Sequence, residues 1–428
     1  MTMTMRSDNS PVPPAVTVPA PVAGGKAAAP VEAPVRLQVR NLYKIFSADT
    51  KPALAMLKAG ASKAEVLEKL RVNVGVLDAS FEVRAGEIFV IMGLSGSGKS
   101  TMIRLLNRLI EPSAGEILLD GRNLTQLSRR ELVAVLRRDM SMVFQSFALL
   151  PHLTALDNAA FGLEIAGVDK ARRHEAAMAA LQQVGLGAYV HRYPREMSGG
   201  MQQRVGLARA LANNPTIMLM DEAFSALDPL IRTEMQDELL RLQREQKRTI
   251  IFISHDLDEA MRIGDRIAIM EGGRIVQVGT PYDILRAPAD DYVRSFFRNV
   301  DVSRVLRAGD VARYEASNTI VRVPGDLRPA LQQLSETGHV YGYVRDGANR
   351  FQGIVSRDSV AQALRGGEPR FLTAFLGGIE PVTSDTPVHT LLRRVAAAPC
   401  PVPVVDADGI YLGAISRSVL LETLDRGA

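Results

Sequence analysis

The chain has almost no cysteine and no long apolar run. Cys400 is the one cysteine among 428 residues, so no disulfide can form within the chain, and we expect a cytoplasmic protein. No stretch reaches the roughly 20 apolar residues that a membrane-spanning helix requires. The first residues lead into prolines rather than into an apolar signal core, which argues against export.

An excess of one charge is also missing. Lysine and arginine number 51 against 47 aspartates and glutamates, and a net charge of +4 is too small at this length to indicate a nucleic-acid partner. A hydrophobic content of 46% is typical of a folded protein, and 428 residues predict two or three domains. Residues 1–34 are rich in proline and alanine, which predicts a disordered tail.

The most informative stretch runs from Glu87 to Thr101. The apolar run Ile88–Met92 predicts a strand that is buried on both faces of a parallel sheet. Gly93–Ser100 follows it and fits G-x-x-x-x-G-K-[ST] at every fixed position, and residues 102–110 then show helical spacing. Strand, glycine loop and helix stand in the order that a phosphate-binding loop requires, so the chain is predicted to bind a nucleoside triphosphate.

Each part of this loop has a chemical role. The glycines allow a tight turn whose N–H groups approach phosphate oxygens, and the helix N-terminus adds partial positive charge. Lys99 can reach the β- and γ-phosphates, while the Ser100 hydroxyl can ligate Mg²⁺. The residues predicted to bind nucleotide here are Gly93, Ser95, Gly96, Gly98, Lys99, Ser100 and Thr101.

Upstream of the loop, Val35–Arg40 alternates apolar and polar residues and predicts a half-exposed strand. Two aromatic side chains follow, and one could stack on adenine: Phe46 is favoured and Tyr43 is the alternative. Residues 51–72 predict two short helices, the second opened by a capping box, and we interpret them as a hairpin inserted at a sheet edge.

Three more apolar strands end in polar side chains. Met140–Phe144 leads to Gln145, residues 217–220 lead to Asp221 and Glu222, and residues 249–253 lead to His255. Because ligands of open parallel sheets collect at the carboxyl ends of the strands, these side chains are predicted to converge on the phosphate loop.

Their chemistry is suited to phosphoryl transfer. Asp221 can hold Mg²⁺, and Glu222 can orient or polarise the attacking water. Gln145 can complete the surroundings of the metal or the water. His255 can hydrogen-bond the γ-phosphate or fix the position of Glu222. With Lys99, these residues form the predicted catalytic set, and Ser100, Gln145 and Asp221 form the predicted metal set.

A second anion site is predicted within residues 146–214, where the pattern turns helical. Ser198, Gly199 and Gly200 open a helix that runs to Leu211. Serine is a good N-cap and the glycines leave backbone N–H groups accessible, so this helix start can also bind an anion.

In order and content these segments resemble the ATPase domains of ABC transporters over about residues 35–300. The matching parts are Gly93–Ser100 (Walker A), Gln145 (Q-loop), Ser198–Gly200 (signature), Met218–Glu222 (Walker B), Ser225–Asp228 (D-loop) and His255 (switch histidine). The resemblance implies an α/β fold with a RecA-like core, an antiparallel β subdomain and a helical subdomain at 146–214. It also implies a head-to-tail homodimer in which Ser198 and Gly200 serve the partner's ATP, and it adds Gly199 and Asp228 to the residues expected to bind nucleotide.

A closer resemblance is to the ATP-binding subunits of glycine betaine/L-proline (quaternary amine) importers of the ProV type. It rests on the insert at 51–72 and on the runs Met142–His152, Asp221–Arg232 and His255–Arg262. Two positions depart from the general ABC pattern: Met201 follows the signature glycines and Ala223 stands where proline is common. We interpret both as marks of the subgroup.

Residues 301–428 contain an internal repeat at an offset of 60. Gly353–Arg357 recurs as Gly413–Arg417, each after a strand-like run and before a helix. These β-β-α units resemble a tandem CBS module, a smaller α+β regulatory domain. Such modules often bind adenine nucleotides through an acidic residue, but Ser359 and Val419 occupy those positions here. A sensing role and a ligand-free spacer or dimerisation role both stay open.

The resemblance implies an ATPase that powers osmoprotectant uptake with ATP and Mg²⁺. Its partners would be integral membrane permease subunits and, indirectly, a periplasmic or extracellular solute-binding protein, which places it at the cytoplasmic face of the inner membrane. Choline, carnitine or another amine is an alternative cargo. A non-transport ABC ATPase of DNA repair or translation is disfavoured, because the chain has neither a long coiled-coil insertion nor a second cassette.

Overall fold

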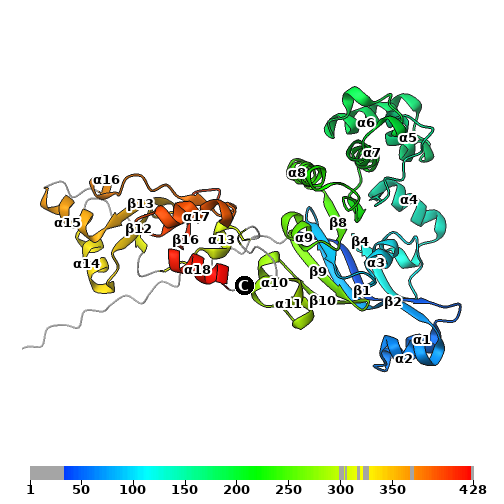
Figure 1. Ribbon diagram of the computed structural model, residues 1–428, viewed down its shortest axis with the longest axis horizontal. Helices are drawn as coiled ribbons and strands as arrows, with labels where there is room; N and C mark the ends of the chain where they lie inside the picture. Colours follow the sequence, from blue (N-terminus) through cyan, green and yellow to red (C-terminus); the bar gives the residue numbers. More distant parts are fainter. Residues whose placement is uncertain are drawn as a thin grey trace, which may run out of the picture. The chain divides into compact units, whose positions relative to one another are not determined.

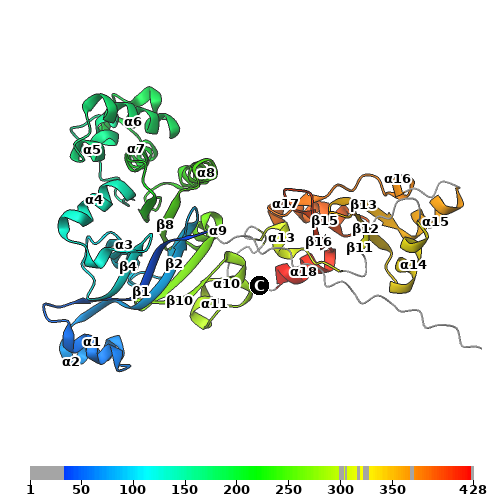
Figure 2. The same cartoon turned by 180° about the vertical axis from the view of Figure 1, so that it is seen from behind.

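The computed structural model describes residues 33–297, 303, 306–315, 319–321, 327–366 and 371–425 (Figures 1 and 2). The tail predicted for residues 1–34 lies almost entirely outside this described part, and so does the predicted boundary at residue 300. In the described residues, no helix combines the length and apolarity required to span a bilayer.

The core of the first domain is a six-stranded sheet. Five neighbouring strands pair in parallel, and β10 adds an antiparallel edge. In spatial order the strands are β10 (Arg274–Gly279), β9 (Arg266–Glu271), β3 (Ile88–Met92), β8 (Thr249–Ser254), β7 (Ile217–Asp221) and β6 (Met140–Val143). The four strands predicted from apolar runs are present, and their carboxyl ends share one edge. Strands β9 and β10 were not predicted.

Both faces of this sheet are covered. In β3, Ile88, Val90 and Met92 pack into one hydrophobic cluster, while Phe89 and Ile91 pack into another on the opposite face. All five side chains are at most 1% exposed, as expected for a central parallel strand. The α/β class predicted from the sequence is therefore confirmed, and its sheet presents strand ends rather than a face to ligands.

A four-stranded antiparallel sheet covers one face. Its order is β2 (Asn73–Arg84), β1 (Val35–Phe46), β4 (Ala114–Leu119) and β5 (Arg122–Asn123). Strand β1 runs beyond its predicted end because a bulge carries it onward. Asn41 and Asp78 both adopt positive φ (43° and 50°), and Asn41 Nδ2 donates to Asp78 Oδ1 at 3.0 Å. Such bulges let a strand turn without leaving its sheet.

The predicted helical hairpin is present as α1 (Lys51–Lys58) and α2 (Lys63–Leu70), inserted between β1 and β2. Ser62 and Glu65 form the predicted capping box at the start of α2. Leu57 and Val66 pack against the base of the β1–β2 pair, so the insert is anchored by its own apolar face.

The region predicted to be helical contains α5 (Ala155–Ile165), α6 (Lys170–Gln183) and α7 (Gly199–Ala212), which form their own group in Figure 1. Asn158 organises the segment before α5. Its side chain is fully buried, Oδ1 accepts from Leu150 N at 2.7 Å, and Nδ2 donates to the carbonyls of Leu150, Leu153 and Thr154. One amide thus satisfies four backbone groups of this loop.

We expect Asn158→Leu to lower the free energy of unfolding by about 2–4 kcal/mol, because it leaves these backbone groups buried without partners. Denaturant unfolding checks this. Asn107→Leu is the control, since the Asn107 side chain accepts from one backbone N–H, that of Leu109, and donates only to the sulfur of Met142 among the described residues. Equal losses from the two substitutions would contradict the prediction.

The remaining helices of this domain lie around the two sheets. They are α3 (Lys99–Leu106), α4 (Arg129–Asp139), α8 (Pro229–Gln246), α9 (Leu257–Ile263), α10 (Pro281–Arg286) and α11 (Asp291–Phe296).

The C-terminal part holds two similar three-stranded sheets, β11-β12-β13 and β14-β15-β16. In both, the first pair of strands is parallel and the second antiparallel. The strands are β11 (Thr319–Val321), β12 (Tyr341–Arg345), β13 (Phe351–Ser356), β14 (Val382–Thr383), β15 (Val402–Val405) and β16 (Tyr411–Ile415). The helices are α13 (Ala308–Val311), α14 (Arg328–Thr337), α15 (Arg357–Arg365), α16 (Phe371–Ala374), α17 (Val388–Ala397) and α18 (Arg417–Asp425).

The two repeats cross over one another. A Cβ on Gly353 of β13 would lie 2.7 Å from the ring of Phe375, which precedes the second repeat. A Cβ on Gly413 of β16 would lie 2.7 Å from the backbone of Arg313, which precedes the first. Between the sheets, Tyr343 and Tyr411 stack with centroids 5.3 Å apart. The predicted repeat is present, and each unit is larger than predicted by one strand and one helix.

In the first repeat, Ser359 occupies the position where nucleotide-binding CBS modules have an acidic residue, and its polar groups are used to cap a helix. Ser359 N donates to Ser356 Oγ at 3.0 Å and Ser356 N donates to Ser359 Oγ at 2.9 Å, which closes a capping box at α15. The resemblance to CBS modules stays a prediction.

Candidate active site

A hollow of about 460 Å³ opens at the carboxyl edge of the six-stranded sheet. The phosphate loop, Glu222 and His255 all line this hollow. The sequence predicted that they would converge. The lining residues are Val74, Gly75, Ser95, Gly96, Gly98, Lys99, Ser100, Thr101, Glu222 and His255.

The phosphate loop is held by close backbone contacts. Gly98 has φ 108° and N-caps α3, and a Cβ there would lie 2.6 Å from the carbonyl oxygen of Gly75. A Cβ on Gly93 would lie 2.1 Å from the carbonyl oxygen of Met270. Glycine is therefore required at both positions, and the loop is wedged between β2 and β9. Gly75 was not predicted, because its role depends on a strand distant in sequence.

Lys99 lies folded over its own loop. Its Nζ donates to the carbonyls of Gly93 at 2.7 Å and Leu94 at 3.0 Å, and the residue is 5% exposed. Burial lowers the pKa of the Lys99 ammonium, while the nearby carboxylates of Glu222 and Asp221 act in the opposite direction. A bound phosphate would offer the Lys99 ammonium a charged acceptor in place of these two neutral carbonyls. The ammonium could therefore leave the carbonyls and donate to a phosphate oxygen.

Asp221 ends β7, and its carboxylate lies near the Ser100 hydroxyl at the start of α3. Burial raises the pKa of Asp221, against the opposing influence of Arg104. A carboxylate and a hydroxyl side by side supply the oxygen donors that Mg²⁺ prefers, so the residues present fit this ion.

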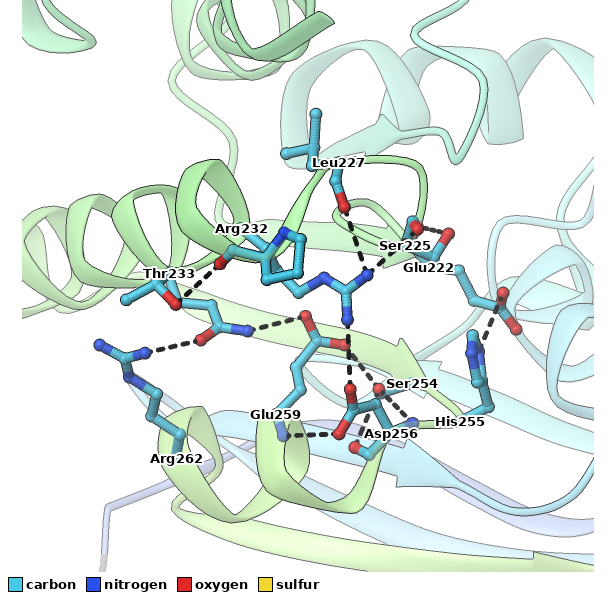
Figure 3. A network of polar contacts seen from close by, with 12 residues as sticks. Glu222, Ser225, Leu227, Arg232, Thr233, Ser254, His255, Asp256, Glu259 and Arg262 are labelled. Atoms are coloured by element: carbon cyan, nitrogen blue, oxygen red, sulfur yellow. Dashed lines mark hydrogen bonds and ion pairs between the residues drawn. The ribbon is translucent and has the colours of Figure 1, made fainter.

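Glu222 and His255 both line the hollow, and their side chains point toward one another (Figure 3). His255 Nδ1 is 3.2 Å from Glu222 Oε2, and the His255 side chain is 55% exposed against 18% for Glu222. Gln145 Nε2 approaches the same Glu222 oxygen at 3.4 Å and Ser225 Oγ at 3.2 Å. Glu222 has φ 45°, a left-handed conformation uncommon for this residue type. The arrangement directs one carboxylate into the hollow with two polar neighbours.

The two aromatic candidates differ in position. Tyr43 is 6% exposed within the cluster that anchors the α1–α2 insert. Phe46 is 49% exposed, and a Cβ on the lining residue Gly75 would lie 2.8 Å from its ring. Phe46 therefore has a half-exposed ring beside the hollow, with Lys44 Nζ 5.2 Å from the ring centroid, and it remains our prediction for adenine stacking.

Comparisons with known proteins identify the family of this chain. The "ABC transporter" family model matches residues 76–225. The glycine betaine/proline betaine transport system ATP-binding protein ProV of Escherichia coli K12 is 56% identical over 396 residues, which cover 92% of this chain and 98% of that protein. The chain belongs to the ABC transporter ATP-binding family.

Two further matches were found. The glycine betaine transport ATP-binding protein OpuAA of Bacillus subtilis is 47% identical over 393 residues, covering 92% of this chain and 93% of that protein. Among solved structures, the dimeric structure of a bacterial ABC transporter cassette matches with 31% identity and a TM-score of 0.48, covering 57% of this chain and 98% of that one.

The ABC signature lies apart from the lining of the hollow. Ser198 N-caps α7 and its Oγ accepts from Met201 N at 3.3 Å. Ser198 and Gly199 are exposed, whereas Gly200 is buried and a Cβ there would lie 2.6 Å from Ile231. None of the three lines the chain's own hollow, so the structure does not bring them together with the phosphate loop.

Asp228 closes the D-loop. It is exposed and N-caps α8, with Oδ1 accepting from Ile231 N at 3.1 Å. Like the signature, it does not line the hollow. Its role in nucleotide binding stays a prediction.

A polar network that sequence reasoning missed lies behind the switch histidine (Figure 3). Glu259 of α9 is 6% exposed, and its carboxylate accepts from Ser254 Oγ at 2.6 Å and from Gln236 Nε2 at 3.1 Å. Asp256 N-caps α9, and Arg232 Nη1 donates to Asp256 Oδ2 at 3.3 Å. These partners are far apart in sequence, and each residue alone is typical of a solvated helix.

We expect Glu259→Gln to change how stability depends on pH. Burial raises the pKa of Glu259 above its unfolded value, so the folded state holds the proton more tightly than the unfolded state. This group therefore makes stability fall as pH rises from the unfolded pKa through the folded pKa. The variant should lose that part of the slope, measured as unfolding midpoints from acid to neutral pH. An unchanged slope would contradict the prediction.

Proposed function

We propose that this chain hydrolyses ATP to power import of glycine betaine, proline and related compatible solutes through separate membrane permease subunits. The supporting observation is the hollow that gathers a phosphate loop, Glu222 and His255 in a chain of this family. The names of its relatives ProV and OpuAA, matched over 92% of the chain, point to this cargo class and hence to osmoprotection.

The residues divide the work of hydrolysis. Lys99 leaves its loop carbonyls to contact the phosphates, and the loop N–H groups cradle them. Ser100 and Asp221, with Gln145, would hold Mg²⁺, which neutralises charge on the transferring phosphoryl group when it is bound. Glu222 orients the attacking water and accepts its proton, and His255 keeps the Glu222 carboxylate in place.

Two copies are proposed to work together. The exposed Ser198–Gly199 helix start and Asp228 do not line the chain's own hollow, so a second copy would use them against its ATP. The pair would dock on the permease at the cytoplasmic face of the inner membrane, through the segment after Gln145. The contact with a solute-binding protein would be indirect, and the CBS-like repeats would regulate transport.

The test is a complex of this chain with its neighbouring permease, reconstituted in vesicles with ATP inside. ATP hydrolysis and uptake of labelled glycine betaine are measured for the parent chain and for Glu222→Gln. Loss of both activities together supports the proposal. Raising the internal salt tests the C-terminal module.

Cargo is decided in the same vesicles. The ATPase subunit does not contact the cargo, so its sequence does not distinguish between related amines. Choline and carnitine are therefore offered in place of glycine betaine. Uptake of neither betaine nor proline alongside active ATP hydrolysis would refute the cargo assignment and leave the ATPase assignment intact.

A further inference from the structure

Arg232, in the first turn of α8, joins two loops of the site. Its Nη2 donates to the carbonyls of Ser225 and Leu227 in the D-loop, both at 3.3 Å. Its Nη1 donates to the carboxylate of Asp256, the residue after the switch histidine, at 3.3 Å (Figure 3). One guanidinium therefore spans the D-loop and the histidine loop, and its fork is rigid enough to fix their separation.

These contacts close a ring around the hydrolytic carboxylate. Ser225 Oγ donates to the Glu222 carbonyl at 2.9 Å, and Glu222 Oε2 lies 3.2 Å from His255 Nδ1. His255 is followed in the chain by Asp256, whose carboxylate accepts from Arg232. Arg232 also donates to the Ser225 carbonyl, and this contact closes the ring. Two routes of contact thus connect the D-loop to His255, one through Glu222 and one through Arg232.

The histidine side of the ring is anchored. Ser254 Oγ donates to Glu259 Oε2, Asp256 N donates to Ser254 Oγ at 3.0 Å, and Glu259 N donates to Asp256 Oδ1 at 3.2 Å. Ser254 is 1% and Glu259 6% exposed. On the D-loop side, Arg232 contacts backbone carbonyls, and Asp228 at the end of the loop is exposed. Arg232 therefore ties the D-loop directly to the anchored histidine side.

We infer that Arg232 is a positioning residue for hydrolysis: it sets the place of His255 and Glu222 according to the position of the D-loop. The inference rests on the proposed ATPase function. Arg232 does not line the hollow, so it acts on the rate of hydrolysis and leaves ATP binding to the phosphate loop. Because the D-loop carries Asp228, hydrolysis becomes dependent on whatever engages that loop.

The experiment compares Arg232→Met with Arg241→Met in the reconstituted complex. Arg241 is a matched control: it lies on the same helix and also donates to carboxylates, those of Glu238 and Glu245, and to a backbone carbonyl. We expect Arg232→Met to lower kcat about tenfold or more, with KM for ATP within threefold of the parent value. Arg232→Lys keeps the charge but not the fork, so an intermediate kcat is expected.

A double-mutant cycle separates positioning from general destabilisation. Asp256→Asn keeps an oxygen for the α9 cap but removes the charge that faces Arg232. If both residues act through one contact, the double variant should be no slower than Arg232→Met alone. Additive losses in kcat would overturn the inference.

Other outcomes are equally decisive. A kcat for Arg232→Met equal to that of Arg241→Met would overturn the inference and leave the proposed ATPase function standing. A parent complex without ATP hydrolysis would instead refute the proposed function. If Arg232→Met failed to fold, Arg232→Lys and Asp256→Asn would carry the same test, and parent-like kcat in both would overturn the inference.

Discussion

Glu222→Gln should reduce ATP hydrolysis by at least about 100-fold, because it removes the carboxylate that we propose as the base that accepts a proton from water. ATP binding should stay within about threefold, since Glu222 contributes one side chain to a hollow whose phosphate contacts come from the loop. Glutamine has the same shape as glutamate and retains a hydrogen-bonding partner for His255, so the fold at this left-handed residue is preserved. Phosphate release and equilibrium binding of a fluorescent ATP analogue measure the two quantities.

The matched control is Glu234→Gln on α8. Glu234 is exposed and lies 3.4 Å from Arg204, so the substitution removes the same charge away from the hollow. It should leave hydrolysis within about twofold, because exposed ion pairs contribute little. More than a tenth of parental hydrolysis in Glu222→Gln would exclude Glu222 as the base.

Lys99→Ala should weaken ATP binding by roughly 100-fold. It removes a charge-assisted hydrogen bond to the phosphates and also the Nζ contacts that hold the carbonyls of Gly93 and Leu94 in the free protein. Hydrolysis should be lost at ATP concentrations that saturate the parent. Equilibrium dialysis with labelled ATP measures the affinity directly.

Lys69→Ala serves as the control, because Lys69 is an exposed lysine on α2 outside the hollow. It should bind ATP with parental affinity. A Lys99→Ala variant that binds ATP as tightly as Lys69→Ala would mean that the backbone N–H groups alone hold the phosphates.

The residues at the carboxyl edge of the six-stranded sheet were predictable, because each strand there has a recognisable local sequence pattern. Ile88–Met92 is apolar throughout, and the change to glycine, lysine and serine that follows is visible in a single window. The same holds for Asp221 at the end of β7 and His255 after β8. Parallel pairing then dictates that their carboxyl ends meet, so local pattern and sheet geometry together were sufficient.

What was missed depends on distant neighbours. Arg232 follows a proline and a leucine at the start of a helix, and nothing nearby shows that Asp256 will lie beside it. Strand β14 has two residues and β11 three, too few for an alternating pattern to be recognised. The bulge at Asn41 extends β1 through contacts with the next strand, which local periodicity cannot reveal.

The crossed packing of the C-terminal repeats determines where the chain can be shortened. Phe375 covers Gly353 from the linker into the second repeat, and Arg313 covers Gly413 from the linker into the first. A chain that stops between the repeats would lose the second repeat. It would also expose the ring face of Tyr343 that stacks on Tyr411. A shortened chain should therefore end ahead of Arg307 rather than within the repeats.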